Sequence, residues 1–118
     1  MPPKTFSLSA KVSFPDYKKV AEELKQLAEQ ALAKDPNILE IYLFGSRAGD
    51  RPSARSDADL LIVLKQGAPR PVDRIPQYLR WFLKAPVPVD VFPVTKSELK
   101  SNRVAQEALR HGRRLCRR

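Results

Sequence analysis

Residues 41–64, IYLFGSRAGDRPSARSDADLLIVL, decide the fold. An apolar run ends at Gly45, a polar loop follows, and a second apolar run begins after Asp57-Ala58-Asp59. Short apolar runs bounded by glycine or loop residues are typical of buried strands. The sequence therefore predicts strands over 38–44 and 60–65, with polar residues at the end of the first and the start of the second.

Further elements lie on both sides of this stretch. A third apolar run, 87–94 (VPVDVFPV), predicts another strand, and 113–117 predicts a short final one. Apolar residues recur at helical spacing in 17–34 and 72–84. Another helix is expected from a cap at Thr95 or Ser97 through Leu109, ended by Gly112. Strands that alternate with helices indicate an α/β or α+β sheet domain.

The N-terminal segment has a different pattern. Residues 5–14 (TFSLSAKVSF) alternate between apolar and polar, which predicts a half-buried strand or an extended arm. At 118 residues the chain fits one domain. We therefore expect residues 1–15 to form an arm or extra strand and residues 16–118 to form the domain. The arm remains open as an edge strand, a dimer arm or a partner-binding segment.

The charge is strongly positive, with 22 Lys+Arg against 13 Asp+Glu and a formal net charge of +9. Such a charge attracts anionic partners, namely nucleic acid, a nucleoside triphosphate or an acidic protein, although a solvated basic surface is the plain alternative. Five arginines fall in the last nine residues: Arg110, Arg113, Arg114, Arg117 and Arg118. No apolar run is long enough to span a membrane, and no signal peptide is evident, so we expect a cytoplasmic protein.

Gly45-Ser46 directly follows the first predicted strand. Glycine lets the backbone approach a ligand closely, and a helix beginning after it would direct free N–H groups at a phosphate. The Ser46 hydroxyl adds a donor, and Arg47 adds a positive charge. A plain turn remains the alternative for this pair of residues alone.

Three aspartates are candidates for a metal site. In a strand, Asp57 and Asp59 face the same side, ~6.5–7 Å apart at Cα, and such a pair suits Mg²⁺ shared with substrate phosphates. Asp90 lies inside VPVDVF, where a charged residue needs a cation or strong donors. If this strand lies beside 60–65, Asp90 completes a three-carboxylate cluster and can accept a proton from an attacking hydroxyl. The alternatives are a solvated strand start for the pair and backbone N–H partners for Asp90.

These motifs together resemble the minimal nucleotidyltransferase family of the DNA polymerase β superfamily. The likeness covers roughly residues 17–117 and rests on LFGSRA, SDADLLIV, PVDVFP and the closing EALRHGRRL. It implies a mixed sheet flanked by helices, with the triphosphate held at Gly45-Ser46. It also implies two Mg²⁺ ions bound by Asp57 and Asp59, with Asp90 binding one of them and helping to activate the acceptor hydroxyl.

The resemblance also implies an activity and a partner. The expected reaction is transfer of AMP from ATP to a hydroxyl acceptor. Transferases of this type are commonly encoded with HEPN toxins, on which they act as antitoxins by adenylylating a tyrosine. Two alternatives stay open: a catalytically silent module that neutralises a partner by binding it, and a nucleic-acid-binding protein that uses the Arg-rich C-terminus. RNA is the less favoured partner.

Several other residues carry a plainer interpretation. His111 beside Gly112 favours exposure or helix-end stabilisation over catalysis. Cys116 favours packing, since no partner base is evident, and Trp81 and Phe82 favour core positions over base stacking. Arg51 and Arg55 in the loop remain open between ligand contact and solvation.

Overall fold

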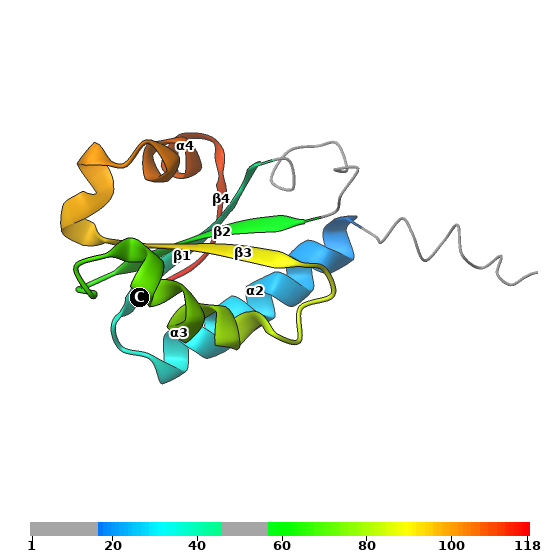
Figure 1. Cartoon of the computed structure of the whole chain (residues 1–118). Helices are drawn as coiled ribbons and strands as arrows, with labels where there is room; N and C mark the ends of the chain where they lie inside the picture. The colour runs from blue at the N-terminus through cyan, green and yellow to red at the C-terminus, as the bar shows by residue number, and fades with distance from the viewer. Residues whose placement is uncertain (1–16, 46–56) are drawn as a thin grey trace, which may run out of the picture.

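A computed structural model of the chain describes residues 17–45 and 57–118. The elements follow one another in an alternating order (Figure 1). They are α2 (Tyr17–Lys34), β1 (Ile38–Phe44), β2 (Ala58–Leu64), η2 (Pro71–Arg74), α3 (Ile75–Leu79), η3 (Arg80–Phe82), β3 (Val89–Thr95), η4 (Lys96–Ser101), α4 (Arg103–His111) and β4 (Arg113–Arg117). The predicted arm, residues 1–15, lies outside the described residues, so that prediction stays untested.

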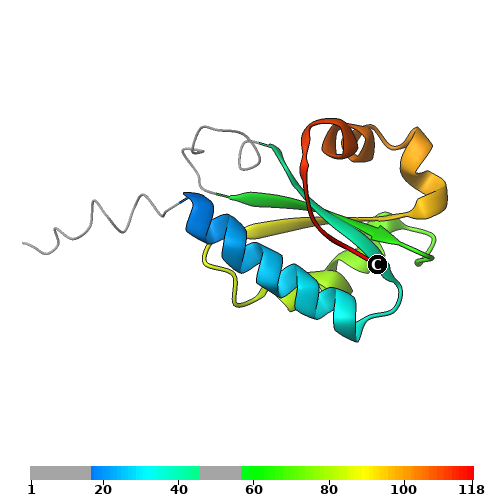
Figure 2. The same ribbon diagram turned by 180° about the vertical axis from the view of Figure 1, so that it is seen from behind.

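The four strands form one mixed sheet in the order β3-β2-β1-β4. Strand β1 pairs antiparallel with both β2 and β4, whereas β2 and β3 are parallel. Helices α2 and α3 cover one face of the sheet and α4 covers the other (Figures 1 and 2). The predicted α/β (α+β) fold with a mixed sheet flanked by helices is confirmed.

The sheet separates two apolar cores. On the α2 side, Leu24 and Ala28 pack with Leu60 and Ile62 of β2. On the α4 side, Leu61 and Val63 of the same strand pack with Ala105 and Ala108. Strand β2 is therefore buried on both faces, which explains its unbroken apolar run. Among the described residues, no helix is long and apolar enough to cross a membrane.

Two predicted helices are broken in the structure. The segment 72–84 forms two 3-10 turns around the short helix α3, in which Pro76 lacks the N–H that a longer helix needs. The segment after Thr95 is a 3-10 helix up to Ser101, and Asn102 then begins α4 by accepting a hydrogen bond from Ala105 N–H. Asn102 has extended backbone angles, so its capping role separates the two helices.

A buried arginine fixes the far end of β3. Arg74 is 3% exposed and donates to both carboxylate oxygens of Glu98, at 2.8 and 3.0 Å. It also donates to the carbonyls of Ala68 and Pro93. Glu98 accepts a further hydrogen bond from Thr95 N–H, which completes a capping box for η4. These contacts tie β3, η2 and η4 together.

The last residue anchors α2. The Arg118 guanidinium donates to the carbonyls of Leu32 and Asp35, at the end of α2, and to that of Ile38 at the start of β1. Carbonyls at a helix C-terminus lack partners within the helix, and a cation there is favourable. One member of the Arg-rich C-terminus is therefore structural.

Candidate functional site

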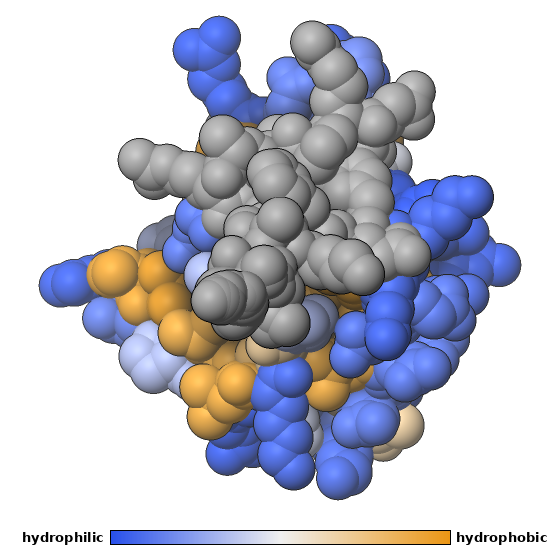
Figure 3. All heavy atoms as spheres, turned by 90° about the vertical axis from the view of Figure 1, so that its right-hand side faces the viewer, coloured by the Kyte–Doolittle hydropathy of each residue, from blue (hydrophilic) through white to orange (hydrophobic). Residues whose placement is uncertain are grey.

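The candidate residues meet at one end of the sheet, where β1 ends and β2 and β3 begin; Figure 3 views the molecule from this end. Phe44, the last residue of β1, pairs with Asp59, and Asp59 pairs in turn with Asp90 of β3. Neighbouring strands lie ~4.8 Å apart, so the register aligns Asp59 and Asp90 side by side. Asp57 lies immediately before β2.

Asp59 and Asp90 project from the α4 face of the sheet. Side chains alternate along a strand, and the neighbours Leu61 and Phe92, two residues further on, pack in the core on the α4 side. Asp90 is exposed, and Asp57 and Asp59 are partly exposed. We call these three residues the acidic rim. The three carboxylates lie at the edge of the α4-side core and are at least partly exposed to solvent.

The acidic rim concentrates negative charge. Partial burial raises the pKa of Asp59 above its ordinary value, and the charges of Asp90 and Asp57 raise it further. Both causes disfavour the ionised carboxylate, so a cation at this place would stabilise it. The rim is therefore a chemically suitable place for a hard divalent cation, which prefers oxygen ligands.

The donor set fits a shared metal site better than a closed one. Within residues 17–45 and 57–118, no group of three acidic, histidine or cysteine side chains is arranged to hold a metal ion by itself. Mg²⁺ commonly takes one or two carboxylates and completes its coordination with substrate phosphates and water. The acidic rim is consistent with this second arrangement.

Gly45 lies directly against the rim. Its φ of +78° belongs to the left-handed region, which side chains disfavour. A Cβ placed there would lie 2.7 Å from Asp59 Oδ2, closer than any van der Waals contact allows. The backbone conformation therefore favours glycine, and any other residue here would also have to displace the Asp59 carboxylate.

Ser46 and Arg47, predicted to bind nucleotide with Gly45, lie outside the described residues, as do Arg51 and Arg55. The structure therefore brings together Gly45, Asp57, Asp59 and Asp90, and the other predicted ligand contacts remain predictions.

An aromatic pair beneath the rim was not predicted. Phe44 and Phe92 contact each other edge to face, with ring centroids 5.3 Å apart and planes at 63°. Phe44 precedes Gly45, and Phe92 follows Asp90 by two residues, so the rings share the face of the acids. Alternation along each strand predicts which face its ring takes, but not that the two rings meet across β2. The rings form an apolar wall beside Asp59, which pairs with Phe44 and is the rim residue whose carboxyl is affected by burial.

The residues given plainer interpretations lie on η3, α4 and β4, not on the strands that carry the acidic rim. Phe82 is buried, and Trp81 packs against the α2-side core with its indole N–H buried and without a hydrogen-bond partner among the described residues. His111 is exposed, with its imidazole 3.4 Å from Glu107. Burial raises the pKa of the Cys116 thiol to about 11, which keeps it protonated at neutral pH.

Comparisons with known proteins agree on the type of domain. The family model for the nucleotidyltransferase domain matches residues 18–115, nearly the whole chain. A protein from Sulfolobus solfataricus assigned as a nucleotidyltransferase has a similar structure, with a TM-score of 0.66 and 23% identity over 92% of this chain and 89% of that one. The structure of the toxin–antitoxin pair MntA–HepT contains a similar chain, with a TM-score of 0.53 and 17% identity over 86% and 73%. No curated protein matches the sequence.

Proposed function

The chain belongs to the nucleotidyltransferase domain family, and from that premise we propose that it is a Mg²⁺-dependent enzyme that transfers AMP from ATP to a hydroxyl acceptor. The observation that carries the proposal is the alignment of Gly45, Asp59 and Asp90 on three adjacent strand ends. Gly45, where we propose that the triphosphate approaches the backbone, lies beside the carboxylates of Asp59 and Asp90. Phosphoryl-type transfer needs this combination, because its catalysis is mainly positioning and charge stabilisation.

Each residue has a distinct role in the proposal. Gly45 gives the triphosphate access to backbone N–H groups, and Ser46 and Arg47 add a hydroxyl donor and a positive charge. Asp57 and Asp59 would hold two Mg²⁺ ions, with Asp90 holding one of them. When bound, these ions would neutralise charge on the triphosphate oxygens.

Asp90 differs from Asp59 in exposure, which suggests its task. Its carboxylate is exposed, so an acceptor hydroxyl can reach it from solvent. As a general base it accepts the proton of that hydroxyl while the hydroxyl oxygen attacks the α-phosphorus and pyrophosphate leaves. Asp59, which is more buried, would instead hold the Mg²⁺ ions that bind the triphosphate. Removing Asp90 should therefore affect turnover more than ATP binding.

We further propose that the acceptor is a tyrosine of a HEPN-type toxin and that the chain is its antitoxin. The fold similarity to a chain of the MntA–HepT pair supports a toxin partner. A tyrosine hydroxyl on a bound partner would be presented to the exposed Asp90. The charge of +9 favours an acidic partner surface.

The test uses labelled ATP with the cognate partner, Mg²⁺, and the Asp90→Asn variant. Wild type should leave a covalent nucleotide on the partner, whereas Asp90→Asn should leave at least 100-fold less, the usual range for losing a general base. Asp73→Asn, an exposed acid on η2, is the matched control and should transfer at the wild-type rate.

The outcome also separates the enzyme from its alternative. If wild type forms the complex and neutralises the partner but transfers nothing with Mg²⁺ or Mn²⁺, the chain is a silent binding module. If Asp90→Asn transfers at the wild-type rate, the three-carboxylate mechanism is wrong.

A further inference from the structure

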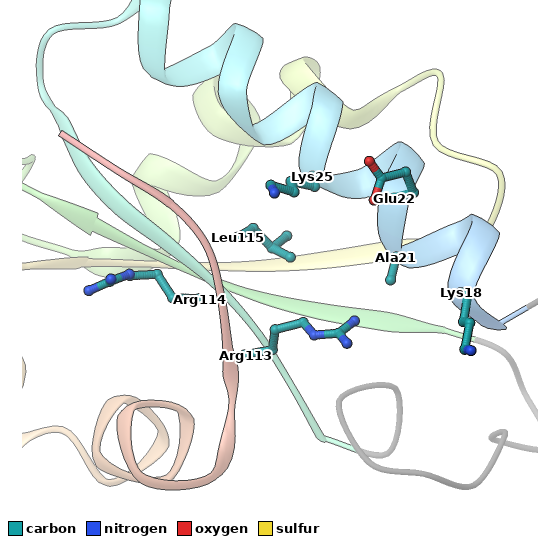
Figure 4. Close-up of a pocket in the computed structure, with 7 residues that line it drawn as sticks. All are labelled: Lys18, Ala21, Glu22, Lys25, Arg113, Arg114 and Leu115. Carbon is teal, nitrogen blue, oxygen red and sulfur yellow. The ribbon is translucent and has the colours of Figure 1, made fainter.

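A groove separates the N-terminal half of α2 from strand β4 (Figure 4). Its volume is about 370 Å³. Lys18 and Lys25 line it from the helix, and Arg113 and Arg114 line it from the strand. The apolar side chains of Ala21 and Leu115, 8% and 4% exposed, form its floor. We call it the α2–β4 groove.

The positive charge of this groove is poorly balanced. Glu22 is the single carboxylate among its lining residues, against four cations, of which Arg114 lies 3.9 Å from Glu40 and Lys18 also has an interaction partner. Lys25 and Arg113 are exposed, and neither forms an ion pair with another residue in 17–45 or 57–118. By contrast, Arg118 is held by carbonyls at the end of α2. Lys25 and Arg113 therefore keep positive charges that no carboxylate of the described residues pairs.

The cations continue around the edge of the sheet. Strand β4 is an edge strand, and Arg114 also lines a second groove on its other face, together with Lys96, Arg117 and its ion-pair partner Glu40. The five residues of β4 span ~17 Å. Cations spread along such a length match a chain of phosphates better than one isolated anion. The space-filling view shows hydrophilic side chains on the α2 and β4 side of this end, and hydrophobic ones on the α3 side (Figure 3).

We propose that the α2–β4 groove binds the phosphodiester backbone of a single-stranded nucleic acid. Proteins that bind single strands without sequence preference use a positively charged groove that follows the backbone. Here the walls supply charge and the apolar floor accepts sugars. The seven described residues that line the groove include no aromatic ring, so binding there depends on phosphate contacts and not on base stacking. Phosphate contacts carry no sequence information, so we expect little preference among bases. An acidic protein surface is the competing occupant, and the experiment separates the two.

The groove opens at the same end of the sheet as the acidic rim. Arg113 pairs with Leu43, one residue from the Phe44 position that pairs with Asp59. Two strand spacings put Arg113 and Asp59 ~10 Å apart at the backbone. Their side chains lie on opposite faces, because Arg113 shares the α2 side with Leu115. Binding of the nucleic acid in the α2–β4 groove is therefore independent of Mg²⁺ and of the proposed transferase reaction.

The experiment measures binding of a fluorescein-labelled 15-nucleotide oligouridylate to the full chain by anisotropy, over a range of salt concentrations. The test variant is Lys25→Ala with Arg113→Ala. The control is Lys65→Ala with Lys84→Ala, two exposed lysines outside the grooves that give the same change in net charge. Lys25→Arg with Arg113→Lys keeps the charge. Circular dichroism checks that each protein is folded, and Arg113→Gln alone replaces the test variant if it is not.

We expect a wild-type dissociation constant of about 10⁻⁴–10⁻⁶ M near physiological salt. The test variant should lose at least tenfold in affinity, and the slope of log K against log salt should fall by about 1.4, or 0.7 for each lost phosphate contact. The control and the charge-keeping variant should stay within threefold of wild type. Asp59→Asn with Asp90→Asn should bind as wild type, even where transfer is lost.

Three results would overturn the proposal. Equal losses in the test and control variants would assign binding to net charge alone. Displacement of the oligonucleotide by poly-glutamate at equal charge concentration would assign the groove to an acidic protein. Loss of oligonucleotide binding in Asp59→Asn with Asp90→Asn would place the nucleic acid at the acidic rim and not in the α2–β4 groove.

Discussion

Replacing Glu98 by glutamine tests whether the buried Arg74–Glu98 pair holds β3 in place. The change keeps the shape of the side chain but leaves the Arg74 guanidinium, 3% exposed, without its counter-charge. Breaking a buried pair costs about 3–5 kcal/mol. Glu98 is 35% exposed, so solvent reduces this cost, and we expect a loss of about 2–3 kcal/mol in the free energy of unfolding.

The assay is urea denaturation followed by circular dichroism at pH 7. The control is Asp73→Asn, which breaks an exposed ion pair with Arg70. The side chain of Arg70 is 74% exposed and that of Asp73 is 53% exposed. Such a surface pair is worth about 0–1 kcal/mol, so the control should remain close to wild type. In a domain of this size, the loss for Glu98→Gln corresponds to a melting temperature lower by about 8–15 °C.

The pH dependence gives a second, independent readout. Hydrogen bonds from Arg74, followed by that from Thr95 N–H, lower the pKa of Glu98 from 4.5 to about 2. A lowered pKa means that the stabilisation is complete above pH 4.5 and is lost as the pH falls toward 2. The stability difference between wild type and Glu98→Gln should therefore shrink across that window. A difference below 0.5 kcal/mol at pH 7 (roughly the noise level for surface changes), or one independent of pH, would refute this reasoning.

Three further predictions concern single residues. Gly45→Val should lower ATP affinity and transfer at least tenfold, because the new Cβ would lie 2.7 Å from Asp59 Oδ2 and the backbone φ is +78°. Normal ATP binding by this variant in isothermal calorimetry would show that the phosphate binds elsewhere. Arg118→Ala should destabilise the fold by about 1–3 kcal/mol in urea, since it leaves the carbonyls of Leu32, Asp35 and Ile38 without this donor, whereas the exposed Arg117→Ala should change stability by less than about 0.5 kcal/mol. The thiol of Cys116, with its pKa raised to about 11, should react with iodoacetamide more slowly at pH 8 in the folded protein than in urea; equal rates would show that the site is open.

The strands were predictable because their signals are local. The apolar runs of β1 and β2 and the Asp57-Ala58-Asp59 segment could be identified from neighbouring residues alone. The breaks in two predicted helices depend on backbone chemistry at Pro76 and Asn102, which an apolar periodicity does not register. The 3-10 helix η2 also places Arg74 where it donates a hydrogen bond to Glu98, 24 residues further along the chain. No local sequence pattern predicts that contact.

The candidate site was predictable in its residue types but not in its arrangement. The sequence indicated that Asp90 needs a partner, yet it could not fix which strand lies beside β2 or in which direction it runs. The parallel pairing of β2 with β3 supplies both. The Phe44–Phe92 wall and the capping role of Arg118 depend on contacts between segments far apart in the chain, so no local pattern announces them.

The parallel register of β2 and β3 has a consequence for refolding experiments. Asp59 is aligned with Asp90 because all seven residues of each strand are paired in step. A slip of β3 by one residue would turn Asp90 to the opposite face and Val91 to the rim. Molecules trapped in that misaligned form would retain most of their circular dichroism signal. Catalytic yield after refolding would therefore count only correctly aligned molecules, while the spectroscopic yield would count both.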